Sequence, residues 1–379
     1  MQETPTIAFV ATTASTISAF MLAHIKKLSN HYNLLVFCNN AASLKKKVPN
    51  NVSLININFF RKPSLIIDFK CFLLLTYLII RKKPFLTISI SPKAGFLNAL
   101  ASFIARVPCR IHWFTGQIWV TKTGLVRKFY MIIDKIIFNL SIHVLVDSKT
   151  QRKFLISNNI ISKIKSSVLL DGSVGGVNIN KFKFDETSRN SKRKKFKISK
   201  NSFVFLYLGR INKDKGIIDL IGAFEKIQGQ YEAFLILVGP IEDSNIKNLI
   251  DDNKKIFYVR KTSTPEKWYA IADIFCLPSY REGFGSVIIE AGSCNMPTLG
   301  SNIYGIKDAI LKNQTGFFHK VGNVDDIKKK MLFVLKNRNL LKIYGRNARK
   351  RVEMNFAEDL ITKKLFEFIN LKKKLIKFI

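Results

Sequence analysis

The stretch FLYLGRINKDKGIIDLIGAF, residues 205–224, passes from an apolar run through a short charged loop into a segment with helical spacing. The apolar run ends at Gly209, and a helix is predicted to begin near Gly216. An apolar strand that leads directly into a helix is typical of a parallel α/β sheet. The loop between them carries Arg210 and Lys215, at the place where such sheets bind anions. Two cations there would suit a diphosphate, and the alternative is a pair of solvated loop charges.

The same alternation of strand and helix runs through the rest of the chain. Further strands are predicted at 6–12, 33–39, 52–59, 85–91, 109–114, 143–148, 167–173, 233–239, 255–260 and 273–279, with helices at 17–29, 64–83 and 94–107 among them. Residues 181–201 are charged and aperiodic, as a linker is. The pattern predicts two doubly wound, Rossmann-like α/β domains, 1–180 and 181–357, that face each other across a ligand-binding cleft. A helix over 358–379 can pack back on the first domain.

A second stretch, REGFGSVIIEAGSCNMP (residues 281–297), places Glu282 and Glu290 eight residues apart around a glycine-rich turn. A helix that starts near Gly285 would put the two carboxyl groups on the order of 10 Å apart. Glycosidase carboxyl groups lie about 5 to 9.5 Å apart, so this pair is stretched for hydrolysis. It suits an extended ligand with hydroxyl pairs at both ends and phosphate between them, as in a nucleoside diphosphate sugar. In the alternative, Glu290 is a surface helix residue and Glu282 a helix cap.

GRINKDKG and ADIFCLPSYREGFGSVIIEAGSCNMP resemble the nucleotide-sugar site of retaining family 4 glycosyltransferases, which have the GT-B fold. SPKAGFLNALASFIARVPCRIHWFTGQIW and GSVGGVNINKF resemble segments of bacterial members that build surface polysaccharides, such as O-antigen or capsule, on lipid carriers. The resemblance implies an enzyme without metal or other cofactor that moves a sugar from a nucleotide-sugar donor with retention. The expected donor is a UDP-sugar, and the expected acceptor is a hydroxyl of a polyprenyl-diphosphate-linked glycan.

The resemblance also implies roles for single residues. Arg210 and Lys215 match the family's diphosphate-binding cations, Glu290 matches the glutamate that holds the ribose, and Glu282 matches the glutamate near the donor sugar. His112 matches a first-domain histidine that faces the transferred sugar, although a histidine at a strand end is more often simply packed. The implied catalytic set is therefore His112, Glu282, Arg210 and Lys215. Further donor contacts are implied for Phe284, Gly285, Ser286, Gly239 and Pro240.

Three positions depart from the family pattern. TTASTIS, residues 12–18, stands where the family has a glycine-rich loop, and Arg260 stands where glycine is common, near the expected nucleobase. Asn295 replaces the glycine of a Cys-Gly turn, which is compatible because asparagine tolerates the left-handed conformation. The alternatives to a transferase are a phosphorylase-like or hydrolytic enzyme with the same cleft, and a non-catalytic GT-B partner or scaffold at a membrane.

The charge of the chain is strongly basic, with 62 Lys and Arg against 26 Asp and Glu, a net of +36. Residues 1–180 hold 23 of the basic residues and only 5 of the acidic ones. Nucleic acid, anionic lipid or phosphorylated substrates would suit this charge, and compositional drift toward lysine is an alternative. No nucleic-acid-binding motif accompanies it, so nucleic acid is not expected as a partner.

Basic clusters in the first half lie beside apolar helical runs, which favours a peripheral position on an anionic membrane surface. They are Lys45–Lys47, Arg61–Lys62, Arg81–Lys83 and Arg127–Lys128. Binding to anionic but not neutral vesicles is expected, reversed by high salt. The apolar run 71–80 is about half the length of a membrane span, and no secretory signal opens the chain. Five isolated cysteines fit a reducing compartment. The expected location is the cytoplasm, at the inner face of the cytoplasmic membrane.

Overall fold

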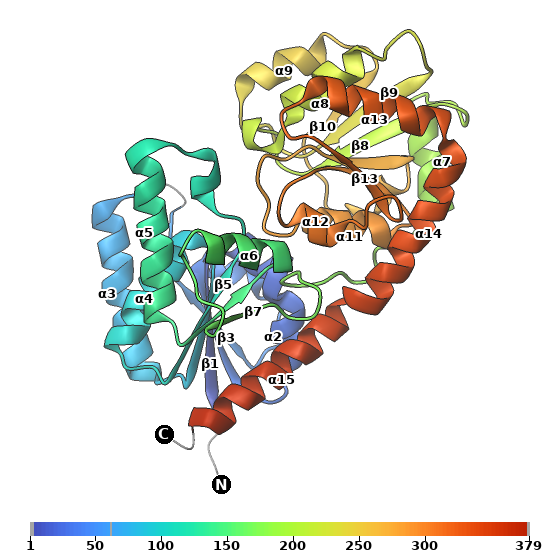
Figure 1. Ribbon diagram of the computed structural model, residues 1–379. Helices are drawn as coiled ribbons and strands as arrows, with labels where there is room; N and C mark the ends of the chain where they lie inside the picture. The colour runs from blue at the N-terminus through green and yellow to red at the C-terminus, as the bar shows by residue number, and fades with distance from the viewer. Residues whose placement is uncertain (1–3, 61–62, 377–379) are drawn as a thin grey trace. The chain divides into compact units, whose positions relative to one another are not determined.

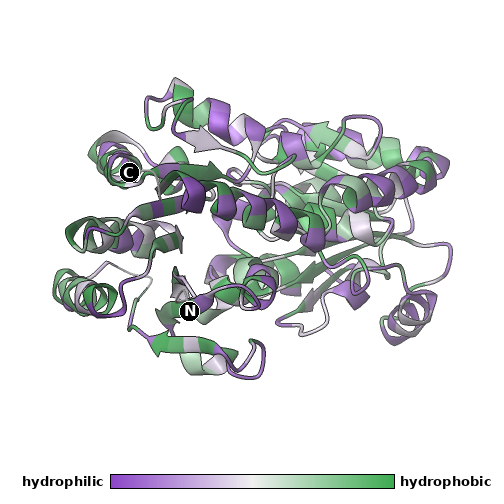
Figure 2. Cartoon of the chain, turned by 90° about the horizontal axis from the view of Figure 1, so that it is seen from below, coloured by the Kyte–Doolittle hydropathy of each residue, from purple (hydrophilic) through white to green (hydrophobic). Residues whose placement is uncertain are grey.

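The computed structural model describes residues 4–60 and 63–376. The chain divides into two compact units: unit 1 runs to Gly176 and resumes at Glu358, and unit 2 spans Val177–Ala357. Each unit is a parallel sheet with helices packed on it (Figure 1). The strands are mostly hydrophobic and the helices mixed (Figure 2), as expected for sheets buried on both faces. The predicted pair of doubly wound α/β sheets is confirmed.

In the described part of unit 1, seven strands form a parallel sheet in the order β3-β2-β1-β4-β5-β6-β7. The strands are β1 (Thr6–Thr13), β2 (Asn33–Asn39), β3 (Val52–Asn56), β4 (Leu86–Ile90), β5 (Cys109–Phe114), β6 (His143–Val146) and β7 (Ser166–Ser167). The order reverses at β1 and β4, which places a switch point between these two strands, and ligands bind beside such points in open α/β sheets.

The helical segments of unit 1 are α1 (Ala14–Thr16), the π-helical η1 (Ile17–Met21), α2 (Leu22–Leu28), η2 (Ala41–Leu44), α3 (Leu65–Lys82), α4 (Pro92–Ile104), η3 (Ile118–Thr121), α5 (Gly124–Leu140), α6 (Lys149–Ser157) and α15 (Glu358–Ile376). The helices α3, α4 and α5 lie side by side, with α4 in contact with both others (Figure 1). Over the ranges that the structure describes, no helix combines the length and the apolar character needed to cross a bilayer.

The last helix of the chain, α15, returns to unit 1 and packs against α2. Leu365 and Ile369 on α15 are fully buried in the core of this unit. The buried imidazole of His24 pairs with the hydroxyl of Thr362 (2.9 Å) and with the carbonyl of Val174 (2.8 Å). Burial lowers the pKa of His24 to about 4, so the ring is neutral at pH 7.

In unit 2, six strands within the described residues form a parallel sheet in the order β10-β9-β8-β11-β12-β13. They are β8 (Phe203–Leu208), β9 (Ala233–Val238), β10 (Ile256–Val259), β11 (Ile274–Leu277), β12 (Thr298–Ser301) and β13 (Gly316–His319). The helical segments are α7 (Glu186–Lys195), η4 (Lys213–Lys215), α8 (Ile217–Glu225), α9 (Ser244–Asp251), α10 (Glu266–Tyr269), α11 (Ser286–Ser293), α12 (Ile306–Ala309), α13 (Val324–Lys336) and α14 (Arg338–Asn355).

The predicted linker is partly wrong, because its middle forms the helix α7. Asp185 caps this helix by accepting a hydrogen bond from the backbone N–H of Ser188. Arg189 and Arg193 form ion pairs of 2.7 and 3.0 Å with Asp273, which precedes β11. The helix is therefore held to unit 2 by arginines rather than by an apolar face, and this explains why the segment lacks apolar periodicity.

Two other local predictions have different outcomes. The strand predicted at 167–173 is wrong in extent, because β7 covers only Ser166–Ser167. Leu170 (φ 51°) and Ser173 (φ 72°) adopt the left-handed conformation, which is incompatible with a continuous strand. The expectation for Asn295 is confirmed, since it adopts φ 58° directly after α11.

Candidate active site

The carboxyl ends of parallel strands meet at one edge of a sheet, and in unit 2 this edge brings the predicted donor residues together. Arg210 follows β8, Gly239 and Pro240 follow β9, and Arg260 follows β10, where it is exposed. The loop with Glu282 connects β11 to α11. Because β8 lies between β9 and β11 in the sheet, the predicted cations and the glutamate loop are neighbours.

The ends of β8 and β9 approach each other closely. A Cβ atom built on Gly239, which has φ 144°, would lie 1.8 Å from the carbonyl oxygen of Gly209. Since no side chain fits there, a residue other than glycine would force the two strands apart.

Two loops at this edge are joined by side chains of opposite charge. Lys215 donates a hydrogen bond from Nζ to Oε1 of Glu282, and the same oxygen accepts one from the hydroxyl of Ser279 (2.9 Å). Arg281 forms an ion pair with Asp214 (2.9 Å). Two predicted site residues, Lys215 and Glu282, therefore connect the β8–α8 loop to the β11–α11 loop, and a second ion pair joins the same two loops.

Arg210, the second predicted cation, has a carboxylate partner of its own. Its guanidinium lies 3.1 and 3.3 Å from the two carboxylate oxygens of Glu242, in the β9–α9 loop. Asn212 donates a third hydrogen bond to Glu242 (2.7 Å). Sequence reasoning missed Glu242, because only the fold brings its loop beside β8. The Arg210 side chain remains 46% exposed and open to an anionic ligand.

The turn before α11 offers a ligand its backbone N–H groups, while the Phe284 side chain is buried. Gly285 is the N-cap residue of α11. The backbone N–H groups of the first turn, which begins at Ser286, therefore have no acceptor within the helix and point away from its N-terminus. The ring of Phe284 is buried and lies 5.2 Å from the ring of Phe356. Phe284 can thus meet a ligand only through its backbone.

Glu290 lies on α11 and binds a partner that differs from those of Glu282. The fully buried Tyr269 donates a hydrogen bond of 2.8 Å from its hydroxyl to Oε2 of Glu290. Burial raises the pKa of Glu290 to about 7, while this hydrogen bond and Lys181 act in the opposite direction. Its protonation therefore changes near neutral pH. Tyr269 was not predicted from the sequence, since nothing local marks it.

In unit 1, His112 is held rigidly on β5. Its Nδ1 pairs with the hydroxyl of Ser89 on β4 (2.9 Å), and its ring meets the edge of Phe114 at 4.6 Å between centroids. A Cβ on Gly95 would lie 2.3 Å from Cε1 of the imidazole, so only glycine allows the ring in this position. Burial lowers the pKa of His112 to about 3, which keeps the imidazole neutral.

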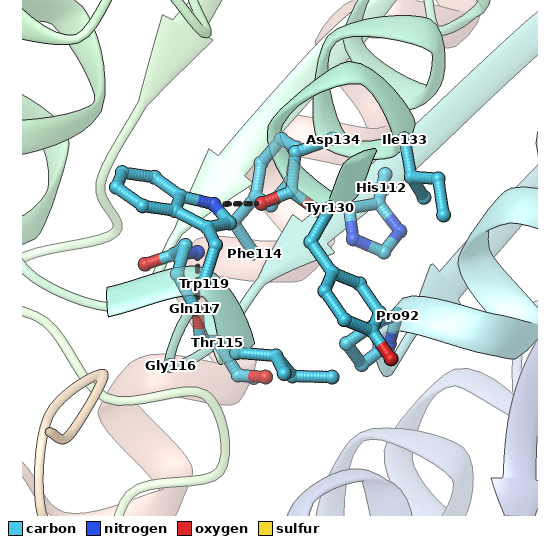
Figure 3. A pocket seen from close by; sticks show the side chains of 11 residues that line it. Pro92, His112, Phe114, Thr115, Gly116, Gln117, Trp119, Tyr130, Ile133 and Asp134 are labelled. Atoms are coloured by element: carbon cyan, nitrogen blue, oxygen red, sulfur yellow. Dashed lines mark hydrogen bonds between the residues drawn. The ribbon is translucent and has the colours of Figure 1, made fainter. Parts of the chain in front are cut away.

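His112 also lines a small hollow that is partly open to solvent. Figure 3 shows the indole N–H of Trp119 directed at the carboxylate of Asp134, a hydrogen bond of 2.8 Å. Tyr130 and Gln117 contribute to the same wall. Burial raises the pKa of Asp134 to about 7. Sequence reasoning missed Asp134, although a lone acid within the apolar helix 129–138 was a signal that could have found it.

In the parts of the chain that the structure covers, no three His, Cys, Asp or Glu side chains gather as a metal site would require. The roles of the predicted site residues remain predictions, because the geometry shows their positions and not a bound ligand.

Comparison with known proteins gives a consistent result. The model of the glycosyl transferases group 1 family matches residues 188–351. The capsular polysaccharide biosynthesis glycosyltransferase CapM of Staphylococcus aureus is 31% identical over 316 residues, which cover 82% of this chain and 83% of CapM. The UDP-Gal:alpha-D-GlcNAc-diphosphoundecaprenol alpha-1,3-galactosyltransferase of Escherichia coli is 25% identical over 306 residues, covering 78% of each protein.

Solved structures show the same fold. The Anabaena protein HepE in complex with UDP superposes with a TM-score of 0.79 at 17% identity, covering 96% of this chain and 99% of HepE. WaaG, a glycosyltransferase involved in lipopolysaccharide biosynthesis, superposes with a TM-score of 0.74 at 13% identity, covering 94% and 98%. The two sheets and their connections are those of the GT-B fold. Together with the identity to CapM, this shows that the chain belongs to the group 1 glycosyltransferases and is a glycosyltransferase.

Proposed function

We propose that this glycosyltransferase transfers a sugar from a UDP-sugar to a hydroxyl of a lipid-linked glycan during the synthesis of a bacterial surface polysaccharide. The observation that carries the donor half of the proposal is the charged edge of unit 2. There Lys215 contacts Glu282 in the loop before α11, Arg210 follows the neighbouring strand β8, and Glu290 lies on α11. The complexes of HepE with UDP and with UDP-glucose support the choice of nucleotide.

Cleavage of the donor leaves negative charge on the diphosphate while positive charge develops on the sugar. Lys215, Arg210 and the backbone N–H groups at the start of α11 would stabilise the leaving diphosphate. Glu290 would accept hydrogen bonds from the ribose hydroxyls once its carboxyl is ionised. Fixed protein charges would thus stabilise the negative charge of the leaving diphosphate, and we therefore propose that the reaction needs no metal.

We further propose retention of configuration without a covalent enzyme intermediate. Ion pairing and hydrogen bonding lower the nucleophilicity of both carboxylates, since Glu282 is bonded to Lys215 and Ser279, and Glu290 to Tyr269. The neutral imidazole of His112 would contact the transferred sugar through hydrogen bonding rather than charge. These roles agree with attack of the acceptor hydroxyl on the face from which the diphosphate leaves.

The acceptor is proposed to be a glycan on a polyprenyl diphosphate, as in the name of the Escherichia coli relative. The reactive end of such a carrier lies at a membrane surface. The clusters Lys45–Lys47, Arg81–Lys83 and Arg127–Lys128 would then draw the enzyme to anionic lipid, with about 1 kcal/mol per engaged cation at low salt. The fourth predicted cluster, Arg61–Lys62, lies outside the described residues.

A turnover screen tests the proposal. Purified protein is offered UDP- and GDP-sugars with a lipid-diphosphate glycan, and release of nucleotide and growth of the glycan are measured. We expect turnover with a UDP-sugar that depends strongly on the acceptor and is strongly reduced in Lys215→Ala. Turnover with a GDP-sugar but with no UDP-sugar would contradict the donor assignment. Cleavage of the donor by water at the same rate as transfer to the glycan would favour a hydrolase.

A further inference from the structure

Helix α3 exposes an apolar stripe. Cys71, Leu75 and Ile79 form its buried stripe and pack into unit 1. The opposite side consists mainly of large apolar residues that are exposed to solvent: Leu65 (92%), Ile66 (71%), Phe69, Leu73, Tyr77 and Ile80. A helix that is hydrophobic on all sides is normally covered, and a contiguous exposed apolar patch marks an interaction surface.

Helix α5 repeats this arrangement. Its inner side carries Asp134 and Tyr130, which line the hollow beside His112. Its outer side exposes Leu125 (83%), Val126, Phe129 and Ile132. Both α3 and α5 contact α4, which lies between them (Figure 1). We refer to the exposed apolar residues of the two helices as the α3/α5 face.

The most exposed residues of this face share one end of unit 1. Helices α3, α4 and α5 each follow a strand of the parallel sheet, so they begin at the edge where the strands end. Leu65, Ile66 and Phe69 lie in the first turns of α3, and Leu125 and Phe129 in the first turns of α5. The hollow lined by His112 and Pro92 is at the same edge, since His112 lies near the end of β5 and Pro92 begins α4.

The exposed charged side chains around the α3/α5 face are positive. Exposed cations flank the apolar residues: Lys70, Arg81, Lys82, Lys83, Lys122, Lys128 and Lys135. The two carboxylates of these helices are already engaged, Asp68 with Lys93 (2.8 Å) and Asp134 with Trp119 (2.8 Å). The α3/α5 face is therefore apolar with a cationic rim.

We infer that the α3/α5 face inserts its apolar side chains into the headgroup region of an anionic lipid bilayer. A cationic rim around an apolar centre matches lipid phosphates above acyl chains, as in helices that lie in a membrane interface. A second copy of this chain fits less well, because a two-fold contact would oppose the same patch to itself and bring like charges together. Insertion would set the hollow beside the lipid surface.

This inference goes beyond charge attraction and does not require that the enzyme transfer sugar. A reporter variant tests it on vesicles that contain neither donor nor acceptor. Trp113, Trp119 and Trp268 are buried, so the emission of a new surface tryptophan in Phe129→Trp can be followed above a constant background. With vesicles containing phosphatidylglycerol we expect a blue shift, and quenching by lipids brominated on the acyl chain. Phe333→Trp on α13, whose native ring is 42% exposed, is the matched control and should change in neither respect.

A second set of variants measures the contribution to binding. Leu65→Ser, Ile66→Ser and Phe69→Ser combined should lower vesicle affinity at least tenfold at low salt, with unchanged thermal stability because these side chains are exposed. Ile343→Ser with Met354→Ser, on the exposed surface of α14, should leave affinity unchanged. Binding that persists in the triple variant without acyl-chain quenching of Phe129→Trp would overturn insertion. A concentration-dependent dimer that the triple variant abolishes would assign the face to a second copy instead. UDP binding of each variant is measured separately, because its loss would indicate damage to the donor site and not a change in membrane binding.

Discussion

The ammonium group of Lys215 donates a hydrogen bond to the carboxylate of Glu282, 67 residues later in the chain. Both side chains are largely buried, with 19% and 15% of their surface exposed. An ion pair in this environment is strengthened by the lower dielectric, and removal of either partner leaves the other charge uncompensated. Lys215 therefore fixes the glutamate loop, and we propose that it also faces the leaving diphosphate.

Replacement of either predicted diphosphate cation should impair the chemical step. We expect Lys215→Ala and Arg210→Ala each to lower kcat/KM on the order of 10²-fold or more, because stabilisation of the developing charge is lost. Lys213→Ala is the matched control, since Lys213 lies in the same loop but is 70% exposed and pairs with Asp243. Steady-state kinetics with a UDP-sugar measure the effect, and a comparable loss in Lys213→Ala would contradict a specific role.

Nucleotide affinity should depend on the protonation of Glu290. Burial raises the pKa of this carboxyl to about 7, and its ionised form accepts hydrogen bonds from a diol better than the protonated form. We expect UDP to bind more tightly as pH rises from 6 to 8, with this dependence flattened in Glu290→Gln. Glu290→Ala should weaken UDP binding at every pH, whereas Glu225→Gln on the exposed surface of α8 should not. Calorimetric titration with UDP measures this, and an unchanged affinity in Glu290→Ala would show that the ribose role is wrong.

The free energy of unfolding should decrease as pH rises, because of Asp134. Its pKa is raised from 3.8 to about 7, so the folded state retains a proton that the unfolded state releases. This contribution to the free energy of unfolding is fully present below about pH 4 and is lost as pH rises through 7, by a few kcal/mol at most. Asp134→Asn should remove this dependence. Melting temperatures of the two proteins at pH 5 and pH 8 measure it, and parallel pH curves would contradict the buried, protonated state.

Activity should survive removal of divalent metal. The cations of Lys215 and Arg210 are expected to neutralise the diphosphate, so turnover in EDTA should equal turnover in Mg²⁺. Activity lost in EDTA and restored by Mn²⁺ or Mg²⁺ would assign that task to a metal ion.

Much of this arrangement is local in the sequence and could be predicted. The strands at 33–39 and 109–114 are mainly apolar, and the structure gives them the same bounds. The helix start at Gly216 and the left-handed Asn295 follow from the backbone preferences of single residues. Motif spacing also brought Arg210, Lys215, Glu282 and Glu290 together as a candidate site.

The partners of these residues were decided by the tertiary structure. Glu242 reaches Arg210 only because β8 and β9 are neighbours, and Tyr269 reaches Glu290 only because α10 packs beside α11. The segment 181–201 lacks apolar periodicity, so its helix depends on the ion pairs that Arg189 and Arg193 make with the distant Asp273. The sequence thus determined which elements form and which charges they carry, because those depend on neighbours along the chain. The ion pairs, the shifted pKa values and the exposed apolar face depend on neighbours in space, and only the folded chain decides those.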